Sequence, residues 1–388
     1  MGKNKFKRKS GVSLEDRKKK LRELAKDDKK KDQKAKYSLD QLLDKAESCI
    51  DKFEYEMAQK FCQRGLEMEP DNVRALETSG ALLIDLGNME AAKQCFGRAV
   101  AVSPNEGYSK YMNLGQLFEG AQSVECFQKG IELMLKEKEL REKAEVATAC
   151  GDGVSACGGG DRDKKGGATD RMISEAYLSI AEIYMTDCCF DDGAEEKCRS
   201  NIEKAITEDE TNPDALQLMA SFLLSKEKNE EARESIKKSV SLWLPDYKAS
   251  EQPEASTSDP IECSQSFESR LAAGKILIEV GEHELSIEVL ETLLEENDEI
   301  VDVWYLIGWA NHLLGEEGKD TARSYLLKAQ KVYKKTRCED EELFKHITEL
   351  LEELGTGDDV MDSDLEPDTI EDAEENIDSD DEKEDMDH

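Results

Sequence analysis

The stretch GALLIDLGNMEAAKQCFGRAVAVSPN, residues 80–105, decides the fold. Apolar residues recur at helical spacing in both of its halves, which predicts two short amphipathic helices. Gly80 and Gly97 stand inside these helical patterns, although each glycine costs about 1 kcal/mol relative to alanine. A single helix pair gives no reason for them. A repeated pair does, if the glycines are contact points between neighbouring helices.

A period of 34 residues links this stretch to the segment before it. Small residues and a proline recur at that distance: Ala46, Ala58, Gly65 and Pro70 correspond to Gly80, Ala92, Ala99 and Pro104. A larger apolar residue follows the second small position in both units, Cys62 in the first and Phe96 in the second. The period predicts that Gly80 lies where the paired helices pack most closely, and it leaves Gly97 unexplained.

This period and its small residues resemble the tetratricopeptide repeat family, in which helix hairpins stack on one another. The pattern continues with insertions and deletions to a seventh unit, where WYLIGW (residues 304–309) matches the family's W-x-x-L-G signature. The third unit has a turn about four residues shorter than usual. A final amphipathic segment, EELFKHITELLEEL (residues 341–354), is expected to cap the last hairpin. The resemblance implies an all-α superhelical solenoid of about seven hairpins with a C-terminal capping helix.

Composition divides the chain into three segments. We expect a basic disordered segment over residues 1–37 and an acidic disordered tail over residues 356–388. The solenoid is expected over residues 38–355, with Ser38 and Gln41 forming a capping box at its start. Flexible loops are expected at about 144–171, where glycines cluster, and at 246–266, which is polar and contains proline.

The charge is large and unevenly distributed. The net charge is −36; residues 1–36 hold 16 Lys and Arg against 6 Asp and Glu, whereas residues 356–388 hold 17 acidic residues against one lysine. The residues between them therefore carry −30. A body this acidic should repel nucleic acid and attract a basic protein.

Nothing in the sequence nominates a catalytic or metal site. The four histidines, His283, His312, His346 and His388, lie far apart without ligand spacing, and no nucleophile motif occurs. The 11 cysteines lack a CxxC pair, which favours reduced thiols in a nuclear or cytoplasmic protein. No apolar run approaches the ~18 residues of a membrane span. We expect no enzyme activity, no cofactor, no metal and no membrane partner.

The candidate site is a surface. In this repeat class, certain positions of each first helix line a concave groove, and here they are mostly acidic. The predicted partner-binding residues are Asp40, Glu47, Asp51, Glu77, Asp85, Gln116, Glu119, Glu175, Glu182, Asp214, Glu268, Glu279, Asp302, Tyr305 and Trp309. Such a wall would attract a cationic chain, and Tyr305 with Trp309 would suit stacking with arginine. A solvated acidic face remains the alternative, as does a buried, inter-repeat Trp309.

Several motifs resemble one narrower family, the dedicated assembly chaperones of the large-subunit ribosomal protein L4. They follow a basic start and are GLEMEPDN (65–72), NLGQLFEG (113–120), CFQKGIELM (126–134), AYLSIAEIYMTD (176–187) and WYLIGWA (304–310). The resemblance implies a chaperone that binds the newly made basic ribosomal protein in its groove. It would keep this client soluble and deliver it for nuclear pre-ribosome (60S) assembly. The alternative is a repeat scaffold that joins nuclear protein complexes.

Localisation and assembly are further expectations. The clusters KFKRK (5–9) and RKKK (17–20) resemble nuclear-localisation signals that an import receptor reads, and the alternative is a counter-charge for the acidic body. We expect the protein in nucleus and cytoplasm, and as a monomer because the last helix would cap the stack. Ser363 and Ser379 each precede glutamate at the third position, a pattern of acidophilic kinases, and their phosphorylation stays open.

Overall fold

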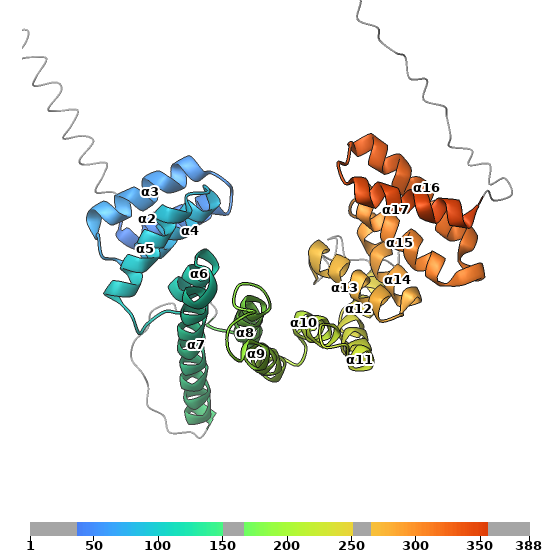
Figure 1. Cartoon of the computed structure of the whole chain (residues 1–388). Coiled ribbons are helices and arrows are strands. Elements are labelled where there is room, and N and C mark those ends of the chain that lie inside the picture. The colour runs from blue at the N-terminus through green and yellow to red at the C-terminus, as the bar shows by residue number, and fades with distance from the viewer. Residues whose placement is uncertain (1–36, 150–166, 251–264, 356–388) are drawn as a thin grey trace, which may run out of the picture. The chain divides into compact units, whose positions relative to one another are not determined.

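The computed structural model describes residues 37–149, 167–250 and 265–355, and the regular elements within these ranges are all helices (Figure 1). The chain divides at Gly281 into two units, which are described separately. The basic segment 1–36 and the tail 356–388, with Ser363 and Ser379, lie outside the described residues.

Within its described residues, the first unit contains five consecutive helix hairpins and two further helices. They are α2 (Leu39–Ile50) with α3 (Tyr55–Met68), α4 (Val73–Asp85) with α5 (Met89–Val102), α6 (Ser109–Leu117) with α7 (Gly120–Ala149), α8 (Asp170–Met185) with α9 (Ala194–Glu208), α10 (Pro213–Leu224) with α11 (Asn229–Ser241), then α12 (Leu244–Ser250) and α13 (Phe267–Glu279). The first helices also pack on one another, α2 on α4, α4 on α6, α8 on α10 and α10 on α13. We call these six helices (α2, α4, α6, α8, α10 and α13) the first-helix row.

The second unit begins with α14 (His283–Leu294) and continues through α15 (Val301–Leu313), the short 3-10 turn η1 (Gly315–Glu317), α16 (Lys319–Thr336) and α17 (Glu341–Leu354). Helix α17 packs on α16 and buries one apolar stripe, Ile347, Leu350 and Leu354. The prediction of a capping helix over 341–354 is thereby confirmed.

Local sequence sets the helix starts. The backbone N–H of Gln41 donates to Ser38 Oγ at 3.3 Å, and the N–H of Ser38 donates to Gln41 Oε1 at 3.1 Å, so the predicted capping box is present. Asn72 and Asn212 accept N–H bonds at the starts of α4 and α10. The hairpins that start with α2, α4 and α10 thus begin at a residue that satisfies a free backbone donor, whereas Tyr108 before α6 and Ile300 before α15 provide no such side-chain cap.

Gly80, Gly115 and Gly308 are glycines of first helices that lie where the first helix of a hairpin meets the second. A Cβ on Gly80 would lie 2.6 Å from Phe96 Cζ, a Cβ on Gly115 would lie 2.8 Å from the Phe127 ring, and a Cβ on Gly308 would lie 2.8 Å from Leu326 Cγ. All three large partners are buried. The expectation of closest packing at Gly80 is therefore confirmed, and the same pairing recurs in other hairpins.

Gly97, which the 34-residue period leaves unexplained, is not a contact point. It is exposed on α5, and a Cβ there would meet no atom within 4 Å. The small residue of the repeat in this helix is Ala99, which is fully buried. Helical phase thus turns Gly97 toward solvent.

Two helices extend into the segments expected as loops. Helix α7 runs to Ala149, because the Glu, Lys, Leu and Ala residues that follow the third unit favour helix. Helix α12 covers Leu244–Ser250, with Pro245 in the first turn, where its missing N–H costs nothing. Where the described residues resume at 167 and 265, Thr169 and Ser266 cap the N-termini of α8 and α13.

The glycine contacts predict opposite outcomes for two matched substitutions. Gly80→Ala should lower the free energy of unfolding by about 1–3 kcal/mol, since the added methyl must displace the buried Phe96 ring. Gly97→Ala should raise it by about 0.5–1 kcal/mol, because only helix propensity changes. Chemical denaturation followed by circular dichroism measures both. Equal stability of the two variants would contradict the assigned contact.

Candidate functional site

The predicted partner-binding residues all belong to first helices of hairpins or follow them directly. In the first unit, α2 and its C-cap carry Asp40, Glu47 and Asp51, α4 carries Glu77 and Asp85, α6 and its following turn carry Gln116 and Glu119, α8 carries Glu175 and Glu182, α10 carries Asp214, and α13 carries Glu268 and Glu279. In the second unit, α15 carries Asp302, Tyr305 and Trp309. Two hollows lie where described helices of the first-helix row meet.

The first hollow has a volume of about 450 Å³ and lies along α2, α4 and α6. Its lining includes three of the predicted acids, Glu47, Asp51 and Glu77, together with Arg74. Ser109 and Asn113 of α6 complete its polar wall. The structure therefore brings these three carboxylates together on one surface.

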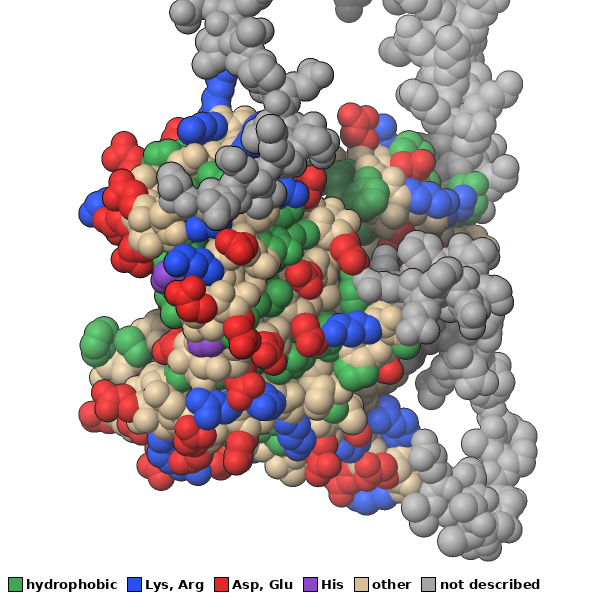
Figure 2. Space-filling view, turned by 90° about the vertical axis from the view of Figure 1, so that its right-hand side faces the viewer, with side chains coloured by type: hydrophobic (Ala, Val, Ile, Leu, Met, Phe, Trp, Pro, Cys, Tyr) green, Lys and Arg blue, Asp and Glu red, His purple; other side chains and the backbone are tan. Residues whose placement is uncertain are grey.

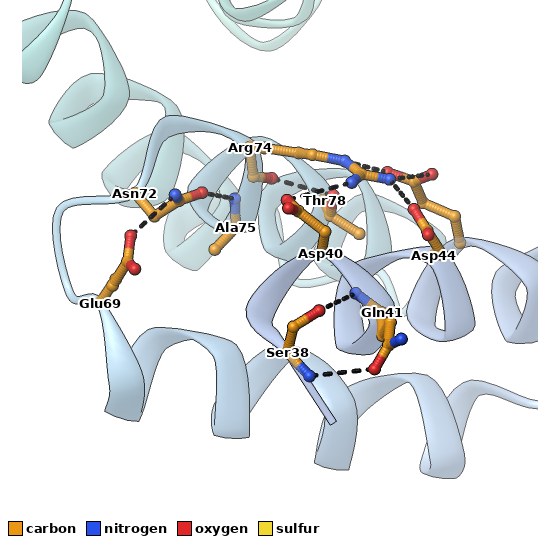
Figure 3. A network of polar contacts seen from close by, with 10 residues as sticks. Ser38, Asp40, Gln41, Asp44, Glu69, Asn72, Arg74, Ala75 and Thr78 are labelled. Atoms are coloured by element: carbon orange, nitrogen blue, oxygen red, sulfur yellow. Dashed lines mark hydrogen bonds and ion pairs between the residues drawn. The ribbon is translucent and has the colours of Figure 1, made fainter. Parts of the chain in front are cut away.

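Arg74 neutralises much of the acidic charge at this end of the row. Its guanidinium donates to Glu47 Oε1 and Oε2 at 3.0 and 2.9 Å and to Asp44 Oδ1 at 2.5 Å, and Asp40 lies 3.8 Å away (Figure 3). The bond to Glu47 is the main cause that raises the pKa of Arg74 above its usual value. Glu47 and Asp40 are thus structural ion-pair partners of Arg74, and only Glu47 of the two lines the first hollow.

Glu77 is the half-buried carboxylate of the first hollow. Its Oε1 is buried and has no hydrogen-bond partner among the described residues. Burial raises the pKa of Glu77, and the charge of Lys110 opposes this shift. Lys110 is itself fully buried and donates to the Gly107 carbonyl at 2.8 Å and to the Glu106 carbonyl, and burial lowers its pKa. A half-buried carboxylate without a close ion pair lowers the stability of the folded chain. Groups destabilised in this way are typical of binding surfaces.

The second hollow has a volume of about 670 Å³ and lies between the α6–α7 turn, α8 and α10. Gln116 and Glu182 are the predicted site residues that line it. The remaining wall is largely apolar, with Phe118, Ile183 and Leu218 among its members. The third and fourth units therefore form one continuous surface feature despite their irregular sequence.

The acids around the second hollow lack strong cationic partners. Glu175 and Glu182 keep solvent contact, yet protein atoms of the surrounding helices partly desolvate their carboxylates and so raise the pKa of each. Asp214 adds like-charge repulsion to both, and only Glu175 has an opposing cation, Arg171. Asp214 accepts a hydrogen bond from Ser269 Oγ at 2.7 Å. Three predicted acids thus form a second anionic group.

Seven predicted residues of the first unit line neither hollow. Asp40, Glu175 and Asp214 have the neighbours described above, and the other four stand apart. Asp85, Glu119, Glu268 and Glu279 are exposed, and the pocket linings at α2–α6 and α6–α10 do not include them. Figure 2 shows one face of the molecule, on which Asp and Glu side chains are interspersed with Lys, Arg and apolar side chains. Because acidic side chains occur all over this face, being acidic and exposed is not enough to assign a residue to a binding site.

In the second unit, the predicted aromatic pair packs against the capping helix. The Tyr305 and Trp309 rings are stacked with centroids 6.0 Å apart, and Tyr305 Oη lies 2.8 Å from His346 Nδ1 of α17. Trp309 is half-buried and meets His346 edge to face. Trp309 is thus neither free on the surface nor fully buried between repeats. Asp302 is exposed on the same helix.

Sequence reasoning missed two features of this surface. One is the pairing of Arg74 with the acids of α2. Its available signal was the spacing of Asp40, Asp44 and Glu47, which places these three acids on one helix face. The apolar wall of the second hollow was missed as well, and its available signal was the shortened turn of the third unit.

Among the described residues, no three His, Cys, Asp or Glu side chains gather as metal ligands. None of the described helices has both the length and the apolar character that crossing a bilayer requires.

Comparison with known proteins places the chain in a family. A tetratricopeptide repeat model matches residues 73–106. The "Probable assembly chaperone of rpl4" of Schizosaccharomyces pombe is 32% identical over 313 residues, which cover 76% of this chain and 84% of that protein. Its namesake in Emericella nidulans is 25% identical over 350 residues, which cover 81% and 80%.

A solved structure agrees with these relatives. The "Assembly Chaperone of RpL4 (Acl4) (Residues 1-338)" superposes with a TM-score of 0.58 at 28% identity, over 74% of this chain and 100% of that one. The fold is accordingly a tetratricopeptide-repeat solenoid. The chain belongs to the family of assembly chaperones of rpl4.

The raised pKa of Glu182 makes a prediction about stability. A carboxylate whose pKa is higher in the folded state contributes stability while protonated, and this contribution is lost as pH rises through the folded-state pKa. Glu182→Gln should therefore raise the melting temperature at pH 8, by about 1–2 °C because solvent contact limits the effect. The gain should shrink as pH falls toward 5.

Thermal unfolding at pH steps from 8 to 5 checks this prediction. The matched control is Glu234→Gln on α11, an exposed acid outside both hollows. It removes the same charge without relieving a desolvated carboxylate. A gain that is the same for both variants would assign the effect to net charge instead of to the hollow.

Proposed function

We propose that this chain is a dedicated chaperone that binds newly made large-subunit ribosomal protein L4 along the first-helix row, keeps it soluble and delivers it to the nuclear pre-ribosome. Two relatives named as assembly chaperones of rpl4 support the identity of the client. The observation that carries the mode of binding is the set of partly desolvated acids Glu77, Glu175 and Glu182 on one helix row.

Charge supplies the physical reason for capture. A segment destined for ribosomal RNA is basic, and it remains without its polyanionic partner until assembly. Carboxylates that neighbouring protein atoms partly shield from water attract such a segment more strongly than fully solvated carboxylates. Each Lys or Arg that arrives offsets the partial desolvation of an acid. Ribosomal RNA, with its higher charge density, would then displace the chaperone.

Binding alone accounts for this role, so the proposal includes no catalytic step and no cofactor. We further propose that the protein acts as a monomer, since α17 covers the last hairpin. Its basic N-terminal clusters would be read by an import receptor, which accounts for a protein present in both nucleus and cytoplasm.

Neutral replacement of the three desolvated acids tests the surface. The variant Glu77→Gln/Glu175→Gln/Glu182→Gln should bind full-length L4 at least tenfold more weakly, because three favourable ion pairs are lost. Biolayer interferometry at 100 mM and 300 mM salt measures the loss, and the variant's affinity should depend less on salt. Glu47 is left unchanged, since its loss would also break the Arg74 network.

The matched control carries the same charge change on second helices. Glu125→Gln/Glu142→Gln/Glu234→Gln alters three exposed acids of α7 and α11 that belong to neither hollow. It should bind L4 nearly as tightly as the parent protein. A control that loses as much affinity as the test variant would refute binding along the first-helix row.

Deleting residues 356–388 separates the chaperone from a scaffold that holds its partners through the tail. The deletion removes 17 acidic residues and one lysine. If the row carries the affinity, the truncated chain should retain L4 binding within about threefold at 150 mM salt, where long-range charge effects are screened. Loss of most binding in the same interferometry assay would favour the tail as the adhesive element.

A further inference from the structure

The second hollow exists because one first helix is cut short. Helix α6 has 9 residues, whereas the other first helices of this unit have 12 to 16. It ends at Leu117, and Phe118 and Glu119 lead directly into α7 at Gly120. The hollow opens beside this short helix and is lined on the α8 side by Ser179, Glu182, Ile183 and Met185.

The geometry of this turn is fixed by two contacts. Gly120 has a φ of +55°, a conformation that favours glycine, and its N–H donates to Asp187 Oδ2 at 3.1 Å beyond the end of α8. Ser123 Oγ donates to the Gly115 carbonyl, which ties the start of α7 to α6. The hollow is therefore a built cleft between anchored elements, and we call it the α6–α8 pocket.

Its lining combines an apolar wall with a single charge. Phe118 and Phe127 come from the α6–α7 side, Ile183 and Met185 from α8, and Leu218 from α10. Glu182 is the one charged residue of this lining. Its carboxylate makes no ion pair with the described lysines and arginines, and Ser179 and Ser221 are among the small polar residues of the lining.

We propose that the α6–α8 pocket binds one large apolar side chain of an extended basic segment of the client, while Glu182 pairs with a Lys or Arg close to that side chain. This inference rests on the proposed function and specifies which segment the chaperone selects. The volume of about 670 Å³ exceeds what a single aromatic side chain fills, so the peptide backbone enters as well.

Charge complementarity identifies the occupant. An acidic or neutral peptide would leave Glu182 without a cation and would face Glu175 and Asp214 nearby. In an extended chain, residues two positions apart lie on the same side and about 6.6 Å from each other. The expected recognition element is therefore an apolar residue with Lys or Arg two positions before or after it. Apolar burial supplies affinity, and the ion pair fixes the register.

The test uses the full chain and biotinylated 15-residue peptides that tile the whole of L4. The tightest peptides should contain this element, and replacing its apolar residue by Ala should weaken binding about tenfold. Ser179→Phe and, as a second variant, Ser221→Phe fill the pocket from α8 and α10. Each should weaken binding of the parent peptide about tenfold and leave the Ala peptide unaffected. Ser241→Phe, an exposed serine of α11, is the control for the added ring.

Glu182→Gln tests the ion pair separately. It should lose affinity for the parent peptide and none for a peptide whose neighbouring Lys or Arg is replaced by norleucine, whereas Glu234→Gln should change neither. If L4 and its peptides bind with equal affinity to the filled and parent proteins, the pocket assignment is wrong while the proposed function stands. If neither L4 nor its peptides bind the parent chain, the proposed function itself fails.

Discussion

Close approach of paired helices is the constraint on which the rest of the structure depends. Gly80 admits the ring of Phe96 against the backbone of α4, and Gly115 and Gly308 admit Phe127 and Leu326 in the same way. Each such contact buries one face of a first helix against its partner. Because an α-helix has 3.6 residues per turn, the opposite face is then turned away from the hairpin and remains available. The first-helix row follows from this packing rule.

The available face is not optimised for stability. Arg74 compensates the acids of α2, yet Glu77, Glu175 and Glu182 stay partly desolvated without ion-pair partners of their own. Proteins commonly give up stability where a surface must bind, since groups satisfied internally offer nothing to a ligand. The same three residues thus account for a stability cost in the free chain and for the attraction of a cationic client.

Sequence reasoning reached the solenoid, the Ser38 capping box and the role of Gly80, because each depends on local spacing. It left Gly97 unexplained, and the structure shows that this glycine has no neighbour within 4 Å of an added Cβ, because helical phase turns it outward. The partners of the groove acids could not be predicted, because Arg74 reaches α2 across about one repeat length. Similarly, Tyr305 and Trp309 were placed on the correct helix, but their contact with His346 depends on how the capping helix packs.

The shortened third unit shows why irregular repeats carry specificity. A regular solenoid presents the same shape at every hairpin, and acidity alone would attract any basic chain, as a polyanionic tail also does. Loss of one turn from α6 breaks that regularity and sets an apolar wall beside Glu182. Electrostatic attraction acts over several ångströms and selects by charge, whereas an apolar cleft selects by shape at contact. A chaperone dedicated to one client among many basic ribosomal proteins needs both, and the irregular junction of the third and fourth units is where this chain combines them.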